Sequence, residues 1–256
     1  MSRLSLVFPL VALVGCTGGA VLSDGETDSD PFAAYDGADL RITEPGSGDL
    51  LLIEEAHTFT AEVRGADGVV MPYDDIAWSS SADAAWLPTG ATFLDETLAP
   101  GMHDITAEAS LPNGDRVAHT IGGVRLQSKW AGTYAGLFSS AVHTQYQNTP
   151  ITVTCSGAAT MVVDLLGETA TGGADCVLAL NGFDVPASYV FDLVNDDGAL
   201  TGTAELDLML TTVPYEATGS IDPETFELTL AFGGEIPVIG TTDGSVAADR
   251  VSLDVE

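Results

Sequence analysis

The chain contains 256 residues, of which 45% are apolar, and it carries a formal net charge of −31 from 38 acidic residues against 7 Lys and Arg. This negative field repels phosphate backbones, so the charge excludes nucleic-acid binding. The apolar fraction is high enough to bury real cores, which excludes an intrinsically disordered chain.

Length and composition together predict an all-β protein with two domains. The chain is longer than the usual ~100–200 residues of a single domain. Glycine is abundant, with 28 residues, and Val, Thr and Ile dominate after residue 35, which favours strands. The acidity has two interpretations: it keeps the protein soluble at a cell surface or in salty water, or loop carboxylates hold structural calcium.

Residues 1–15 have the features of a removable export signal. Arg3 precedes an apolar run at residues 4–13, and Pro9 interrupts that run. A bilayer-spanning helix needs ~20 apolar residues, so this run is too short to be a permanent anchor. The segment therefore fits a signal peptide better than a transmembrane helix.

The signal ends at Leu13-Val14-Gly15-Cys16, which resembles the lipobox of bacterial lipoproteins. The resemblance implies that a peptidase cuts before Cys16 and that Cys16 carries the lipid. The protein would then be anchored in the bacterial cell envelope, in the periplasm or at the surface, and Thr17 favours the outer membrane. The alternative is an ordinary signal peptide in which Cys16 is incidental. Residues 16–36 are small, polar and acidic, which predicts a flexible tether.

Residues 37–127 predict a sandwich of short strands separated by turns. Residues 57–63 alternate apolar and polar side chains, and we expect Ile76 and Trp78 to point into the core. His103 has no second histidine at a metal-ligand spacing, which predicts a hydrogen-bonded residue rather than a metal ligand.

Three stretches of this region, residues 76–80, 98–106 and 113–115, resemble the immunoglobulin-like domains, related to PKD modules, of secreted bacterial proteins. The resemblance implies an immunoglobulin-like β-sandwich whose tryptophan fills the centre. Such modules mostly act as spacers or adhesion units, and the resemblance carries no catalytic residues.

Residues 128–256 predict a second β domain. The start Trp130-Ala131-Gly132-Thr133-Tyr134-Ala135-Gly136 resembles the first strand of small antiparallel barrels, lipocalin-like calycins among them. Short turns then predict a meander, that is, an antiparallel barrel or sandwich of ~8 strands. Further strand-length segments are residues 151–155, 158–165, 175–180, 187–194, 199–208, 215–221, 226–232 and 245–255.

Cys155 and Cys176 are the cysteines that remain if Cys16 carries lipid, and an even pair in an oxidising compartment predicts a disulfide. We expect the two cysteines in strands separated by one intervening strand. Closing a loop of this length stabilises a fold by roughly 3 kcal/mol in the chain-entropy model. The alternative is two buried free thiols.

The sequence predicts no catalytic, cofactor-binding or metal-binding residues. Nucleophile-elbow, zincin, P-loop and Rossmann patterns are all missing from it. Asn195, Asp196 and Asp197 bring three oxygen-bearing side chains together, which could suit calcium, but a hairpin tip of this composition needs no ligand.

The leading hypothesis is a non-enzymatic, lipid-anchored envelope protein with the membrane as one partner. Its immunoglobulin-like module would space a β domain that contacts a protein or carbohydrate at the cell surface. One alternative is a binder of a small apolar ligand, which needs a cavity open at one end of the C-terminal barrel. Another is an enzyme such as a glycosidase or other carboxylate-dependent hydrolase, which needs two converging carboxylates or a catalytic triad in a cleft.

Overall fold

Strands make up nearly all of the regular structure in the computed structural model, which describes residues 30–82, 87–180, 183–208 and 211–255. The predicted all-β class is confirmed, because these described ranges form sixteen strands and one short 3-10 helix, η1 (Ala33–Tyr35). Within the same ranges, no helix is long and apolar enough to cross a membrane. The export signal, Cys16 and the tether up to residue 29 lie outside the described residues.

Residues 39–127 fold into two four-stranded sheets that share one core. In the first sheet, β3 pairs with each of the other three strands: β1 (Asp39–Glu44), β3 (His57–Arg64), β4 (Val70–Met71) and β6 (Thr92–Asp95). The second sheet has the order β2 (Leu50–Leu52), β8 (Arg116–Gln127), β7 (Gly101–Ser110) and β5 (Ile76–Ser80). All pairs are antiparallel except β2 with β8, which run parallel.

Aromatic rings fill the space between these two sheets. Ile76 and Trp78 point inward as predicted, and both side chains are fully buried. The indole N–H of Trp78 donates to the carbonyl of Gly90 at 2.8 Å, and the ring meets Phe59 and Phe93 edge-on. The N-terminal unit is therefore a sandwich around a central tryptophan. Its resemblance to immunoglobulin-like domains stays a prediction.

Residues 132–252 form a closed antiparallel barrel, which is one of the two architectures that the sequence predicts. Each strand pairs with the next along the chain: β9 (Gly132–Tyr146), β10 (Thr149–Val163), β11 (Thr169–Leu180), β12 (Phe183–Asp196), β13 (Ala199–Leu208), β14 (Thr211–Ile221), β15 (Glu227–Ile236) and β16 (Gly240–Ser252). The ladder between β16 and β9 closes the ring, so the second domain is a barrel rather than a sandwich.

Large side chains fill the middle of the barrel. Phe138, Tyr189, Phe191 and Phe232 come from three different strands, and each is at most 5% exposed. Neighbouring ring centroids in this group lie 4.7–6.0 Å apart, which is ordinary aromatic packing. The middle of the barrel is therefore a packed core.

The disulfide between Cys155 and Cys176 is formed, with Cα atoms 5.7 Å apart. The expectation of one intervening strand is wrong, because the two cysteines lie in the adjacent strands β10 and β11. The segments 151–155 and 158–165 were expected to be separate strands, with Gly157 between them. They belong to one strand, because β10 pairs with β9 continuously from Thr149 to Val163.

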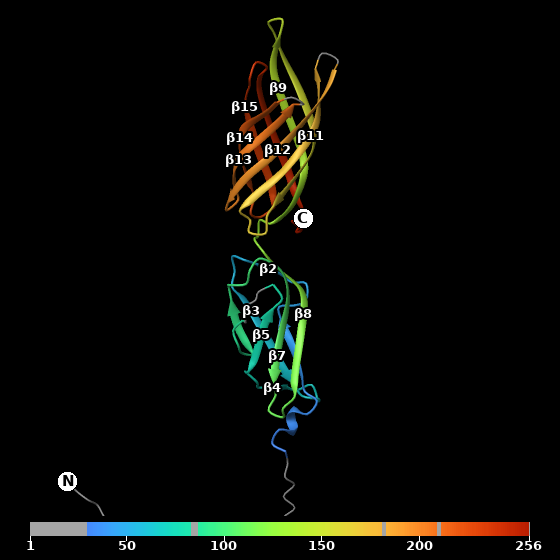
Figure 1. The fold of residues 1–256 in the computed structure, drawn as a ribbon, viewed down its shortest axis with the longest axis vertical. Helices are drawn as coiled ribbons and strands as arrows, with labels where there is room; N and C mark the ends of the chain where they lie inside the picture. Colours follow the sequence, from blue (N-terminus) through green and yellow to red (C-terminus); the bar gives the residue numbers. More distant parts are fainter. Residues whose placement is uncertain (1–29, 83–86, 181–182, 209–210, 256) are drawn as a thin grey trace, which may run out of the picture.

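The two units are arranged end to end, with the barrel beyond the sandwich (Figure 1). Short polar contacts hold the junction. The carboxylate of Glu54 accepts a hydrogen bond from the Ser128 hydroxyl at 2.6 Å. The Arg125 guanidinium forms an ion pair with Asp254 at 2.7 Å. One contact joins the sandwich to the linker, and the other joins it to the segment that follows β16, so both ends of the barrel chain are tied to the sandwich.

Removal of the disulfide by the double change Cys155→Ala and Cys176→Ala should lower the free energy of unfolding by about 3 kcal/mol, because the unfolded chain is then no longer cross-linked. Urea denaturation followed by circular dichroism measures this loss. Wild-type protein under reducing conditions is the matched control and should unfold at the same urea concentration as the variant. An unchanged midpoint in the variant would contradict the stabilising role.

Candidate functional site

We define the distal end of the barrel as the end that carries the β9–β10 turn and the β15–β16 turn. A groove and an exposed apolar turn lie at this end, and a buried polar network lies below it. The β9–β10 hairpin extends beyond the rest of the barrel, at the end away from the sandwich (Figure 1). The β15–β16 turn contains Pro237, Val238 and Ile239. Both turns line one groove, so they form a single surface.

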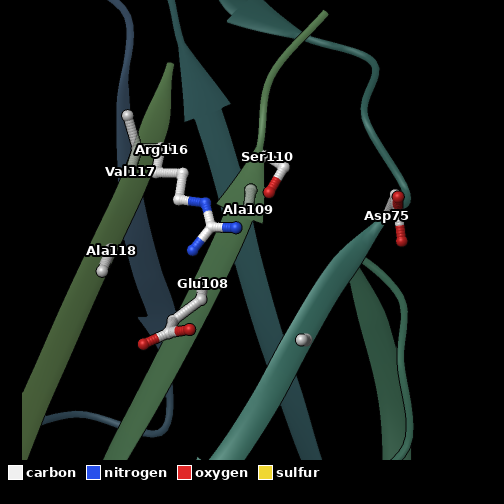
Figure 2. A pocket seen from close by; sticks show the side chains of 8 residues that line it. Asp75, Glu108, Ala109, Ser110, Arg116, Val117 and Ala118 are labelled. Atoms are coloured by element: carbon white, nitrogen blue, oxygen red, sulfur yellow. The ribbon is translucent and has the colours of Figure 1, made fainter. Parts of the chain in front are cut away.

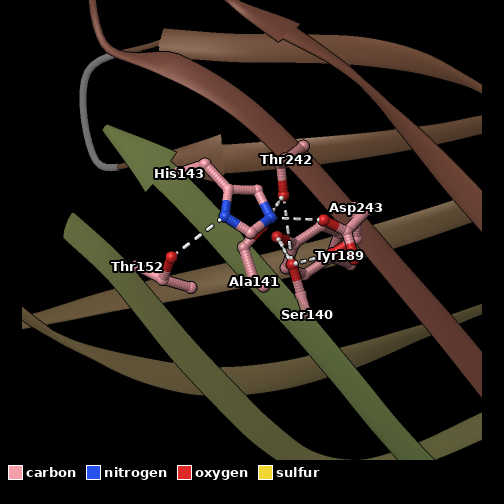
Figure 3. A network of polar contacts seen from close by, with 7 residues as sticks. All are labelled: Ser140, Ala141, His143, Thr152, Tyr189, Thr242 and Asp243. Atoms are coloured by element: carbon pink, nitrogen blue, oxygen red, sulfur yellow. Dashed lines mark hydrogen bonds and ion pairs between the residues drawn. The ribbon is translucent and has the colours of Figure 1, made fainter. Parts of the chain in front are cut away.

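A buried polar network crosses the barrel interior below this surface. The Ser140 hydroxyl lies 2.8 Å from the Tyr189 hydroxyl and 3.2 Å from that of Thr242 (Figure 3). Ser140 also donates to the carbonyl of Asp243 at 3.2 Å, and Thr242 donates to that of Ala141 at 3.0 Å. The Ser140 and Thr242 hydroxyls each donate to a backbone carbonyl. The Ser140 oxygen is then left to accept, so the Tyr189 hydroxyl is placed to donate to it. The network therefore joins β9, β12 and β16.

Tyr215 brings a second tyrosine hydroxyl into the distal half of the barrel. Its side chain is 4% exposed, and its hydroxyl has no hydrogen-bond partner within the described part of the chain. Burial, and then the neighbouring Tyr189, raises the pKa of Tyr215 to about 12. Gly234 makes room for the ring, because a Cβ at this position would lie 2.8 Å from the ring edge. The hydroxyl is therefore held protonated in an apolar setting.

An acid, a histidine and a hydroxyl form a line on the outer wall. His143 Nε2 lies 2.6 Å from a carboxylate oxygen of Asp243, and its Nδ1 lies 3.1 Å from the Thr152 hydroxyl (Figure 3). Asp243, His143 and Thr152 are thus arranged as acid, base and hydroxyl, which is the arrangement of a nucleophilic catalytic triad. Acyl transfer also needs donors around the oxyanion and a site that excludes water. These side chains lie instead on the open face of three adjacent strands, so the geometry supports a cross-strand polar ladder.

The distal groove beside His143 has a volume of about 600 Å³ and runs between β9, β10 and the β15–β16 turn. Val238 at its rim is fully exposed and adopts a φ of +70°. A β-branched residue is strained in this left-handed region. Ile239 is also exposed, so the turn presents an apolar edge to solvent. Such an edge suits contact with another macromolecule.

A second groove lies on the N-terminal unit, over the outward face of β5, β7 and β8 (Figure 2). Its volume is about 360 Å³, and Asp75, Glu108 and Arg116 line it. The Arg116 side chain extends from β8 over β7, between Glu108 and Ser110 (Figure 2). Charged and small residues alternate along this face, and the groove contains no apolar anchor.

The other histidines have structural hydrogen bonds. His103 is hydrogen-bonded, as predicted: it is buried, with its two ring nitrogens 2.6 Å from the Ser80 hydroxyl and 2.8 Å from the Ala99 carbonyl. His57 lies 2.8 Å from the Leu52 carbonyl. His119 accepts from a backbone N–H of β1. These residues hold strands and loops of the sandwich together.

In the hairpin tip considered for calcium, Asn195 and Asp197 have protein partners. Asn195 is buried, accepts from the Gly198 N–H at 2.9 Å and donates to the Gly167 carbonyl at 2.6 Å. Asp197 forms an ion pair with Lys129 at 3.2 Å. Across the described ranges, no group of three or more His, Cys, Asp or Glu side chains could hold a metal ion. Structural calcium stays an alternative to the prediction of no cofactor.

Comparison of the chain with models of known protein families and with curated proteins gave no match.

Sequence reasoning missed the distal surface. The lack of Lys and Arg between residues 131 and 249 marks the whole barrel wall and does not locate this surface. A signal for this surface was present at Val238 and Ile239, which lie between Pro237 and Gly240. A turn normally carries polar residues, so two apolar residues in this place were unusual. The buried network had no local signal, since Ser140 and Thr242 are 102 residues apart in sequence.

Tyr215→Phe and Tyr189→Phe form a matched pair of variants. Tyr215→Phe removes a buried hydroxyl without a partner, so the free energy of unfolding should be unchanged or rise by about 1 kcal/mol. Tyr189→Phe removes the hydrogen bond between the Tyr189 and Ser140 hydroxyls. This change should lower the free energy of unfolding by about 0.5–1.5 kcal/mol. Urea denaturation of both variants tests whether Tyr189→Phe is less stable than Tyr215→Phe. Equal losses in the two variants would show that the Tyr215 hydroxyl is also bonded.

Proposed function

We propose that the protein is a lipid-anchored, non-enzymatic envelope protein that presents its barrel as a binding module on a bacterial membrane. In this proposal Cys16 carries the lipid, and the outer membrane is favoured over the inner. The tether predicted for residues 16–36 ends before η1, because Tyr35 of η1 packs against Tyr73 of the sandwich. The sandwich acts as a spacer. The partner is bound by the outer surface of the barrel.

The end-to-end arrangement carries this proposal. The described chain begins at the end of the sandwich that faces away from the barrel, and the distal end of the barrel is at the opposite extreme (Figure 1). A lipid on Cys16 would therefore place the distal surface away from the membrane. One acyl chain gives only marginal membrane binding, so the multiple chains of a bacterial lipoprotein suit a stable anchor.

The packing of the barrel supports binding on its outside. Phe138, Tyr189 and Phe232 occupy the middle of the interior, which leaves the apolar-ligand alternative without a supporting observation. The acid–histidine–hydroxyl line on the open wall likewise gives the hydrolase alternative no enclosed site. The apolar turn at Val238 and the distal groove provide exposed contact surface instead.

Replacement of the lipidated residue tests the anchor. In bacteria that express the chain with Cys16→Ser, labelled palmitate should no longer be incorporated, and the protein should move from the membrane fraction to the soluble fraction. Cys155→Ser is the matched control, because it removes a different cysteine and should leave palmitate incorporation unchanged. Continued incorporation of palmitate in the Cys16→Ser protein would refute the anchor.

A further inference from the structure

One side of the barrel wall carries no charged side chain. Residues 130–163 contain no Asp, Glu, Lys or Arg, and they include all of β9 and β10. Each of the other six strands of the barrel contains at least one Asp or Glu. The outward side of β9 and β10, together with Ser245 and Ala247 of β16, is therefore a distinct surface in a chain with 38 acidic residues. We call it the neutral face.

The ladders place the side chains of the neutral face in rows across three strands. In one row, Leu137 of β9 lies between Ala247 of β16 and Ala158 of β10. Leu137 is 76% exposed, which is the highest value for a large apolar side chain on any strand that the structure describes. The neutral face is thus an apolar side chain surrounded by small ones. The next row toward the distal end consists of Ser245, Ser139 and Ser156, all exposed.

The carboxylates of the wall lie mostly on the other side of the barrel. In the closed ring, β13 and β14 are opposite β9 and β10, and they expose Glu205, Asp207 and Glu216. Eight strands spaced about 4.8 Å apart give a barrel roughly 15 Å across. The Debye length at physiological ionic strength is about 8 Å, so charges on the far side are largely screened at the neutral face.

A second copy of the chain is the partner that this charge pattern fits. A cationic partner is attracted instead to the carboxylates on the rest of the wall. Two copies repel each other through those carboxylates. The neutral face is the part of the described wall where two copies can approach without bringing carboxylates together. Small side chains also lose little conformational freedom when they are covered.

We propose that two copies of the chain associate through the neutral face as a symmetric dimer. In a two-fold arrangement the same patch is used on both copies, so each Leu137 packs on the small side chains around the other. Asp175, Asp243 and Asp249 border the face and stay at the rim of the contact. The proposal goes beyond the proposed function and does not depend on a lipid at Cys16.

Sedimentation velocity over a range of protein concentrations tests the proposal. Every protein carries Cys16→Ser, so that the lipid and the export signal are the same in all of them. We expect a reversible equilibrium between monomer and dimer that shifts toward the dimer as salt is added, because salt screens the repulsion that remains between the rims. Dissociation of the dimer by salt would indicate a contact between opposite charges and would contradict the proposal.

Leu137→Glu and Val190→Glu are matched variants. Each puts a carboxylate in place of an exposed apolar side chain on a strand that is paired on both sides. Leu137→Glu brings two like charges together in the contact and should raise the dissociation constant of the dimer at least about tenfold. Val190 lies on β12, outside the neutral face, so Val190→Glu should change this constant less than about threefold. Circular dichroism checks that both variants are folded.

Cross-linking in bacteria identifies the molecule that covers the neutral face. A photo-reactive phenylalanine analogue in place of Ser139 should give a covalent product with the mass of two chains. The same analogue in place of Val190 should not give this product.

A single monomeric species at every concentration, or equal weakening of the dimer by the two glutamate variants, would overturn the proposal. Cross-links from position 139 to a different protein, without the product of two chains, would overturn it as well, because the neutral face would then have another partner.

Discussion

Closure of the barrel depends on large side chains that lie over glycines of neighbouring strands. The Phe232 ring covers Gly244 so closely that a Cβ there would be 2.2 Å from the ring, and Met161 covers Gly172 in the same way. A few large residues can therefore fill the interior, as small barrels require. Because the interior is taken up by the chain itself, contacts with other molecules are left to the outer wall and the ends.

Local features of the fold could be predicted from the sequence, and long-range ones could not. Alternation around Trp78 placed that residue correctly, because strand periodicity is a property of neighbouring residues. Residues 151–155 and 158–165 were predicted as separate segments, but pairing with β9 continues through both of them. The sequence could not decide between a barrel and a sandwich for residues 128–256. The difference is the ladder between β9 and β16, two strands at opposite ends of this domain's sequence. The network at Ser140 and Thr242 depends on the same closure.

Charge is distributed unevenly between the two parts of the molecule. Four of the seven basic residues, Arg41, Arg64, Arg116 and Arg125, lie in the sandwich, and Lys129 and Arg250 lie at the junction. At the junction these cations are used in contacts, because Arg250 covers the Phe226 ring at 3.5 Å and Lys129 pairs with Asp197. The rest of the barrel wall is anionic or neutral. Under the proposed function, the anionic wall would favour partners that carry positive charge.

Strand β9 connects the junction directly to the distal hairpin and pairs along its length with both β10 and β16. Ladder hydrogen bonds lie perpendicular to the strands. If a bound partner is pulled away from the membrane while the anchor holds, tension runs along β9, and these bonds are loaded together in shear instead of being peeled apart one by one. Under the proposed function, the strand that bears the load would also be the one that closes the ring.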